Sequence, residues 1–309
     1  MISKKAARER HMRSLKIILL VLILAAGPGL AAQSQNQTPR LVSTEWLAAN
    51  LNNENIRIVD SRLDIRDYWL SHIPGAVYLD TAVLRWPERG VPSKLLSPEA
   101  LVILLGQMGI TEKTMVVAYY DKNGYPPFYL LWALDYIGHP VSALLEDGFE
   151  RWRREGRPLN QDYPKIKPAA YPKPAKLNTQ FRATIEEVVR DMKAGAVLVD
   201  NRSEDLYTGE KGAWKRKGHI RGALSHPWVM DLGGDGSWKP REELAAEYAR
   251  IGVTPDKEVI VYCGQGQQAA HTYFSLKYIL GFPDVRLYDG GFNEWANRDE
   301  LPVQTGKNP

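Results

Sequence analysis

The sequence repeats itself at one fixed spacing, and this repeat restricts the possible folds more than any other feature. Two glycines and two aromatic residues of the first half recur in the second half, always the same number of positions later. The pairs are Gly109/Gly252, Gly138/Gly281, Phe149/Phe292 and Trp152/Trp295. Chance matches would not share one spacing, so the chain is expected to contain two copies of one structural unit.

Each copy also contains the same three segments in the same order. They are an apolar run ending in Asp-x-Arg, a His-Ile-x-Gly-Ala segment and an Asp-Gly segment ending in tryptophan, at 56–62, 72–76 and 147–152 in the first copy and at 196–202, 219–223 and 289–295 in the second. Apolar runs typical of buried strands alternate with helical patterns, among them the strands 115–120 and 259–262 and the helices 130–137 and 268–280. This alternation predicts an α/β fold with two domains, each a parallel sheet with helices on both faces.

Several residues indicate where helices begin. Ser43 or Thr44 is expected to cap a helix, and Ser97 stands before a proline in the same role. Thr184 and Glu187 form the spacing of a capping box. Together with the repeat, these signals predict a first domain over 40–158, a proline-rich linker over 159–180 and a second domain over 181–306.

The first 32 residues have the pattern of a secretory signal peptide. A basic start is followed by the apolar run 17–26 and by small residues suited to cleavage. We therefore expect a periplasmic or secreted protein with no membrane attachment after cleavage. Removing this segment takes the formal net charge from +4 to slightly negative, so the basic balance of the whole chain gives no reason to expect nucleic-acid binding.

The only cysteine of the chain, Cys263, lies in the second copy. It follows the predicted strand 259–262 and precedes the helical pattern that starts at Gln268, with Gly264 and Gly266 between them. Unpaired N–H groups at a helix N-terminus favour negative charge, and the thiolate is the nucleophilic form of cysteine. The position therefore predicts a nucleophile, whereas the alternative is a buried cysteine that acts as a small apolar side chain.

The first copy lacks this nucleophile. Tyr120 stands at the position that corresponds to Cys263, and the following segment, 121–127, ends in two prolines. Proline removes N–H donors that an anion site would use. The first domain is therefore expected to be non-catalytic and to form one wall of a cleft with Cys263 at its floor.

Taken together, the two copies and the Cys-Gly-x-Gly loop of the second resemble a tandem-domain rhodanese of the thiosulfate/3-mercaptopyruvate sulfurtransferase family, of the exported bacterial type. The resemblance covers about residues 40–306. It implies a sulfurtransferase that moves a sulfane sulfur from a donor such as thiosulfate or 3-mercaptopyruvate to cyanide or a thiol. It also implies a persulfide on Cys263, no cofactor and no metal, and we expect a monomer.

On this resemblance, the loop after Cys263 binds the substrate through its backbone amides, and two arginines are further candidates for substrate binding. These residues are Gly264, Gln265, Gly266, Gln267, Gln268, Arg202 and Arg221. For Arg202 the competing role is an ion pair with Asp200 inside the domain. His219 is expected to be structural, because His72 recurs in the domain without a nucleophile.

The loop departs from the family pattern. It lacks the basic residues of thiosulfate-preferring relatives, its glutamines replace the Ser, Val and Thr of mercaptopyruvate-preferring ones, and Leu206 stands where the family has an arginine. Weak donor binding is therefore expected, and an exported persulfide carrier with little turnover is the alternative function. A cysteine phosphatase on the same fold would need an arginine that grips phosphate at the end of a longer loop, which this sequence does not have.

Overall fold

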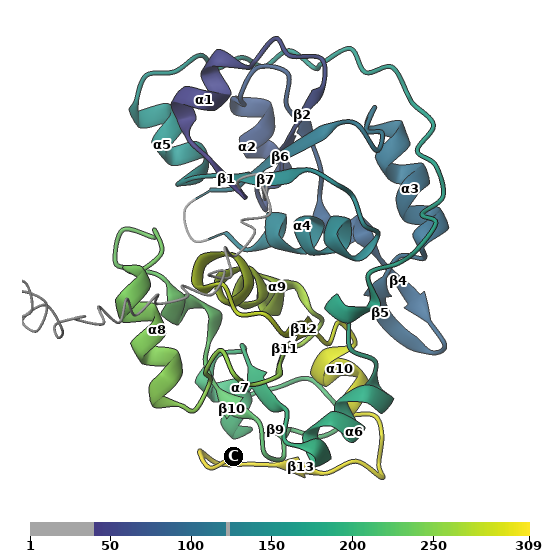
Figure 1. Ribbon diagram of the computed structural model, residues 1–309, viewed down its shortest axis with the longest axis vertical. Coiled ribbons are helices and arrows are strands. Elements are labelled where there is room, and N and C mark those ends of the chain that lie inside the picture. Colours follow the sequence, from purple (N-terminus) through teal and green to yellow (C-terminus); the bar gives the residue numbers. More distant parts are fainter. Residues whose placement is uncertain (1–39, 122–123) are drawn as a thin grey trace, which may run out of the picture. The chain divides into compact units, whose positions relative to one another are not determined.

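The computed structural model describes residues 40–121 and 124–309, and it contains two separate parallel sheets, one in each half of the chain (Figure 1). The predicted signal peptide, 1–32, lies outside the described residues. No helix in the described part of the chain is both long and apolar enough to cross a membrane. The prediction of two α/β domains with parallel sheets is confirmed.

The first domain has a five-stranded sheet in the order β1-β7-β6-β2-β3 and a separate antiparallel hairpin, β4–β5. Its strands are β1 (Leu41–Val42), β2 (Ile56–Asp60), β3 (Val77–Tyr78), β4 (Arg85–Glu88), β5 (Val91–Leu95), β6 (Met115–Tyr119) and β7 (Ser142–Leu145). Its helices are α1 (Thr44–Ala49), α2 (Ile65–Leu70), α3 (Pro98–Gln107), α4 (Pro126–Tyr136) and α5 (Gly148–Arg154).

The second domain has a four-stranded sheet in the order β10-β8-β11-β12 and a short antiparallel pair, β13-β9. Its strands are β8 (Val197–Asp200), β9 (His219–Ile220), β10 (Leu224–Ser225), β11 (Val259–Tyr262), β12 (Val285–Leu287) and β13 (Val303–Gln304). Its helices are α6 (Ile185–Ala194), α7 (Glu204–Thr208), α8 (Arg241–Arg250), α9 (Gln267–Phe274) and α10 (Gly291–Trp295).

The predicted capping residues agree with the structure. The side chain of Ser43 accepts a hydrogen bond from the N–H of Trp46, so Ser43 rather than Thr44 caps α1. Ser97 caps α3 in the same way, and Thr184 forms both bonds of a capping box at the start of α6.

Two predicted helix boundaries were wrong. The helix predicted from 130 begins earlier, at Pro126, because proline is well suited to the first turn of a helix. The helix predicted over 268–280 begins at Gln267 and stays α-helical only to Phe274, after which Ser275–Leu280 forms a π-helical turn. Sequence periodicity does not distinguish these two helix types over so short a run.

Helices cover both faces of each sheet, as predicted. On strand β2, Ile58 packs with α1 and α5, while the next residue, Val59, packs into the cluster of α3 and α4. On strand β11, Ile260 packs with α6 and α10, while Val261 packs with α8 and α9. The cluster around α4 and α9 is continuous from one domain to the other, so the two domains share one apolar core.

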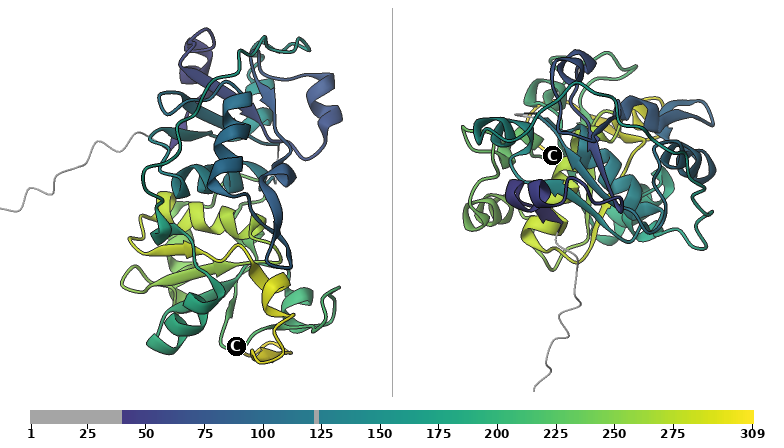
Figure 2. Two further views of the ribbon diagram at one scale, coloured as in Figure 1. Left: turned by 90° about the vertical axis from the view of Figure 1, so that its right-hand side faces the viewer. Right: turned by 90° about the horizontal axis from the view of Figure 1, so that it is seen from above.

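Helix α4 is the centre of this shared core. Every one of its residues is buried, and α9 of the second domain packs against it (Figures 1 and 2). Phe128 of α4 lies edge-on against Phe274 of α9, with the ring centroids 5.3 Å apart. A helix that is buried on all sides needs apolar residues all round, which explains why its sequence shows little amphipathic pattern.

The proline-rich segment between the domains has no helix or strand from Gln161 to Asn178, as its prolines predict. It packs along α3, where the N–H of Ala169 donates to the carbonyl of Gly106 at 2.8 Å.

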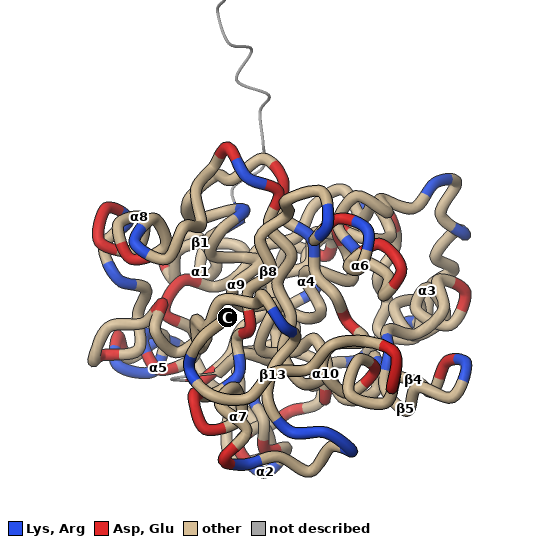
Figure 3. Tube along the Cα trace, turned by 90° about the horizontal axis from the view of Figure 1, so that it is seen from below, with Lys and Arg blue, Asp and Glu red and all other residues tan. Residues whose placement is uncertain are grey.

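Along the described trace, basic and acidic residues are interspersed (Figure 3).

Each domain contains a buried Asp-x-Arg ion pair at the end of one strand, which is β2 in the first domain and β8 in the second. In the first domain, Arg62 Nη2 lies 2.7 Å from Asp60 Oδ2, and neither side chain is more than 2% exposed. The same guanidinium donates to the Ser71 carbonyl and lies 3.9 Å from the centroid of the Phe149 ring. In the second domain, Arg202 makes the same contacts with Asp200, Gly218 and Phe292.

This recurrence predicts that the first-domain pair stabilises the fold. Asp60→Asn should lower the free energy of unfolding by about 3 kcal/mol, because it leaves the Arg62 charge buried without a carboxylate. Urea denaturation measures the change. Asp64→Asn is the matched control, since Asp64 pairs with Arg66 at the surface; equal losses from the two variants would contradict a structural role for the buried pair.

Candidate functional site

Cys263 lies at the carboxyl end of β11, directly before the loop Gly264–Gly266 and the start of α9. Two glycines of this region are required by their surroundings. Gly266 has φ +85°, and a Cβ there would lie 3.1 Å from Asp289 Cα. Gly291 has φ +56°, and a Cβ there would lie 2.5 Å from the Cys263 carbonyl oxygen. The Asp-Gly-Gly segment of the repeat therefore packs directly on the cysteine loop.

The Cys263 thiol is nearly buried, with 3% of the residue exposed. Burial raises the pKa of this thiol, while the backbone N–H groups of Ala269, Gln265 and Gln268 act in the opposite direction. Two of the five predicted loop amides, those of Gln265 and Gln268, therefore act on the thiol together with the amide of Ala269, and they favour the thiolate as expected. Desolvation of the charged form outweighs three hydrogen bonds here.

Cys263 opens into a cavity of about 230 Å³. Both domains line it, with Tyr125 from the first domain and the remaining residues from the second; these are Arg202, Leu206, Trp214, Cys263, Gly264, Gln265, Gln267 and Gln268. Of the predicted loop residues, all but Gly266 line the cavity. The structure thus places the cysteine at the boundary of the two domains, as predicted.

Of the two arginines predicted to bind substrate, Arg202 lines this cavity and Arg221 does not. Its Nε and Nη2 are used by the ion pair with Asp200 and by the Gly218 carbonyl. Its Nη1 is buried and has no hydrogen-bond partner among the described residues. The ion pair with Asp200 is therefore present, and Nη1 is left as a buried donor at the wall of the cavity.

The structure does not bring Arg221 to the cysteine. Arg221 is exposed in the turn after β9 and is not among the residues that line the cavity. His219 is buried and stacks on Tyr207, with the ring centroids 3.7 Å apart. His72 stacks on Tyr68 in the same way at 3.9 Å, which supports a structural role for both histidines.

Two contacts across the domain boundary were missed by the sequence analysis. Arg85 Nη1 of β4 donates to Gln265 Oε1 at 2.5 Å, and Gln267 Nε2 donates to Thr81 Oγ1 at 3.4 Å. Two of the three glutamines that depart from the family loop, Gln265 and Gln267, therefore contact the first domain. No spacing in the sequence could have shown this, because the partners lie in different copies of the repeat.

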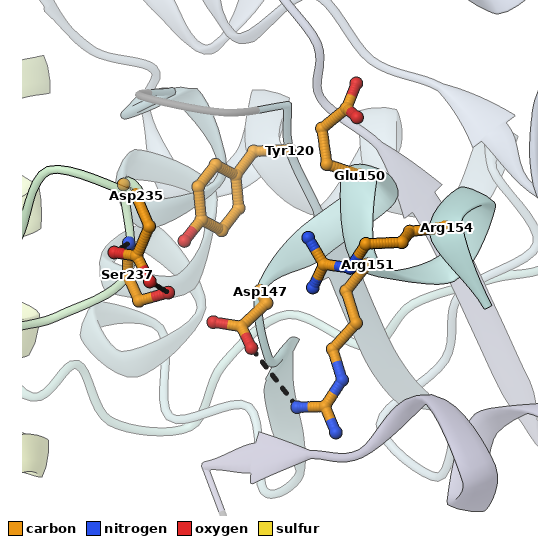
Figure 4. Close-up of a pocket in the computed structure, with 8 residues that line it drawn as sticks. Tyr120, Asp147, Glu150, Arg151, Arg154, Asp235 and Ser237 are labelled. Carbon is orange, nitrogen blue, oxygen red and sulfur yellow. Dashed lines mark hydrogen bonds and ion pairs between the residues drawn. The ribbon is translucent and has the colours of Figure 1, made fainter.

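The first domain has an equivalent position at Tyr120, directly after the carboxyl end of β6. The N–H of Phe149 donates to the Tyr120 carbonyl at 2.8 Å, as the N–H of Phe292 does to the Cys263 carbonyl. A cavity of about 260 Å³ lies beside Tyr120 (Figure 4). It is lined by Tyr120, Asp147, Glu150, Arg151, Arg154, Asp235, Gly236 and Ser237. The phenol ring of Tyr120 stands where the second domain has its thiol, so this position has no sulfur nucleophile.

No group of three or more His, Cys, Asp or Glu side chains within 40–121 and 124–309 is placed to hold a metal ion.

The rhodanese-like domain model matches the chain twice, at residues 43–155 and 184–298. Among curated relatives, the sulfur carrier protein TtuD of Thermus thermophilus is 36% identical over 280 residues, covering 86% of this chain and 97% of that protein. A thiosulfate sulfurtransferase of Corynebacterium glutamicum is 35% identical over 280 residues, covering 87% of this chain and 91% of that protein.

Solved structures agree with these relatives. SseA of Escherichia coli, described as a 3-mercaptopyruvate sulfotransferase with the rhodanese fold, is 28% identical and superposes with a TM-score of 0.73, covering 82% of this chain and 99% of that one. EanB is 27% identical with a TM-score of 0.77, covering 86% of this chain and 69% of that one.

The buried thiol generates a prediction about pH. Because burial raises the pKa of Cys263, the thiolate fraction at neutral pH is lower than in a free thiol, and the rate of alkylation by iodoacetamide should still be rising above pH 8.5. Its midpoint should lie above about 8.5, the value of an ordinary cysteine. Intact mass spectrometry follows the single thiol, with glutathione as the reference; a midpoint below that of glutathione would contradict the dominance of desolvation.

Proposed function

The chain belongs to the rhodanese family, and we propose that it is a sulfurtransferase that carries a sulfane sulfur on Cys263. The observation that carries this proposal is the position of the thiol. It is the only thiol of the chain, it faces three backbone N–H groups, and it opens into a cavity large enough for a small donor. Relatives named thiosulfate sulfurtransferase support the same chemistry.

In the first half-reaction, the thiol proton passes to solvent and the Cys263 thiolate attacks the outer sulfur of thiosulfate. An S–S bond forms between Sγ and this sulfur, the S–S bond of thiosulfate breaks, and sulfite leaves with the electron pair. With 3-mercaptopyruvate, the C–S bond breaks instead and pyruvate leaves after protonation of its carbon. Arg202 lines the cavity and its Nη1 has no hydrogen-bond partner within the described residues, which supports a role in holding the anionic group of either donor.

In the second half-reaction, an acceptor attacks the terminal sulfur of the persulfide. Cyanide forms a bond to this sulfur, the S–S bond to Sγ breaks, and thiocyanate leaves while Cys263 recovers its thiolate. The N–H groups of Gln265, Gln268 and Ala269 surround the sulfur. They stabilise negative charge on the thiolate and on the persulfide, which is the role of an oxyanion hole in acyl transfer.

We further propose that the protein acts outside the cytoplasm. The support is the signal-like segment 1–32 of the sequence.

Cys263→Ser should reduce thiocyanate formation from thiosulfate and cyanide to the uncatalysed rate, because a hydroxyl is not ionised at neutral pH. Far-ultraviolet circular dichroism should be unchanged. Tyr120→Phe is the matched control, because Tyr120 is the equivalent of Cys263 in the first domain, and this variant should retain the wild-type rate. Residual transfer by the serine variant near the wild-type rate would place the chemistry elsewhere.

A second function is supported by one specific observation. The loop Gly264–Gln268 contains no lysine or arginine, and the relative TtuD is named a sulfur carrier protein. A carrier would accept sulfur on Cys263 and deliver it to a protein partner, with little turnover on small acceptors.

Turnover separates these two functions. With thiosulfate and cyanide both in excess, a sulfurtransferase continues to form thiocyanate, whereas a carrier stops after about one equivalent, because the chain has a single thiol to load. We expect sustained formation, since the cavity leaves the sulfur accessible from the domain boundary. A burst of about one equivalent that is followed by no further product would favour the carrier.

A further inference from the structure

The guanidinium of Arg85 stands beside the cysteine loop without a carboxylate. Its Nη1 donates to Gln265 Oε1, and no Asp or Glu among residues 40–121 and 124–309 forms an ion pair with it. Its Nε is buried and has no hydrogen-bond partner within the same residues. A half-buried charge without a counter-ion is costly to maintain, and an anionic ligand at the guanidinium would neutralise it.

The other arginines at the domain boundary are neutralised. Arg40 Nη2 lies 2.7 Å from Asp135 Oδ1, and Arg182 Nη2 lies 3.0 Å from Asp289 Oδ2. Arg85 therefore differs from its neighbours in lacking a protein anion, although it is the one that contacts a residue lining the Cys263 cavity.

The hairpin holds Arg85 in this place. Arg85 pairs with Leu95 in the β4–β5 register, and the N–H of Leu95 donates to Asp289 Oδ2 at 2.9 Å. Asp289 belongs to the segment that packs against the cysteine loop of the second domain. The first-domain hairpin is thus fixed on the second domain at both strands, and it extends toward that domain in Figure 1.

Arg85 also lies within electrostatic range of the cavity. Burial raises the pKa of Tyr125, a residue that lines the cavity, and the charge of Cys263 raises it further while Arg85 opposes the increase. The charges of Cys263 and Arg85 therefore both act on Tyr125.

We propose that Arg85 is a specificity-determining residue of the Cys263 site, which binds the anionic group of the sulfur donor in place of Gln265. The inference rests on the proposed sulfurtransferase function. The Gln265 amide oxygen occupies one N–H of the guanidinium, and a sulfonate or carboxylate oxygen is a stronger acceptor for it than a neutral amide. The cation that the loop lacks in sequence is then supplied by the other domain, and the site is suited to anionic donors, most of all to the dianion thiosulfate.

Four variants test this. Arg85→Gln should raise KM for thiosulfate by about tenfold or more, the range expected for a lost hydrogen bond to a charged group. KM for 3-mercaptopyruvate, with its single carboxylate, should rise less. The rate at which cyanide discharges the preloaded persulfide should not change. Arg85→Lys should recover most of the thiosulfate affinity, because it restores the charge.

Gln265→Ala separates an anion site from a simple tether between the domains. It removes the same hydrogen bond but leaves the Arg85 charge, so its KM for thiosulfate should rise much less than that of Arg85→Gln. Arg89→Gln at the tip of the same hairpin is the control for a general loss of positive charge, and it should leave KM unchanged.

The outcomes are distinct. If the wild-type protein forms no persulfide at saturating thiosulfate, the proposed function itself is wrong. If the wild type loads sulfur but Arg85→Gln and Gln265→Ala raise KM equally, or neither raises it, Arg85 is a structural contact and the inference is overturned. Thermal denaturation of each variant shows whether any loss of affinity comes from unfolding instead, and an Arg85→Lys variant that folds but fails to recover affinity would also contradict the role of the charge.

Discussion

The burial of α4 against α9 is the interaction on which the rest of the structure depends. Each helix packs on its own sheet, and together they close one apolar core that runs through both domains. This packing brings the first domain against the cysteine loop of the second. Tyr125, which directly precedes α4, consequently becomes a wall of the Cys263 cavity, and hairpin β4–β5 reaches the segment around Asp289. A single rhodanese-like domain would have the cysteine loop but not this enclosure.

Enclosure has an electrostatic cost that the structure meets in different ways. Asp135 is buried in the interface, where burial raises its pKa, and Arg40 and Tyr278 act against that increase. Asp289 is held by Arg182. At the cysteine, backbone amides oppose desolvation and the Arg202 guanidinium interacts with the thiolate charge, yet the thiol pKa stays raised. Charges at the interface are thus paired where they serve packing, whereas the guanidinium of Arg85 lacks an oppositely charged partner within the described residues.

Much of this could be predicted from the sequence because it is encoded locally or by repetition. The α/β class follows from alternating patterns, the cap at Thr184 from two residues three apart, and the position of Cys263 from a strand, two glycines and a helix. The repeat also identified the Asp200–Arg202 pair, since Asp60 and Arg62 recur where no nucleophile is present.

The rest depends on contacts between distant parts of the chain, which no local pattern reports. Arg85 appears in the sequence as one basic residue in an irregular stretch, and only the docking of the hairpin brings it to Gln265. Arg221 is the opposite case, because it lies within a repeated motif but is exposed to solvent and does not line the cavity. The sequence identified loop amides that favour the thiolate, but it gave no measure of the burial that raises the thiol pKa.

The central claim is that sulfur from an anionic donor resides on Cys263. Its most direct test is the intact mass of the purified protein before and after incubation with thiosulfate, followed by addition of cyanide. The account predicts a gain of about 32 Da, one sulfur atom on the only thiolate, which is absent in Cys263→Ser and is removed by cyanide. A protein whose mass does not change with thiosulfate or 3-mercaptopyruvate, or whose gain persists in the serine variant, would contradict it.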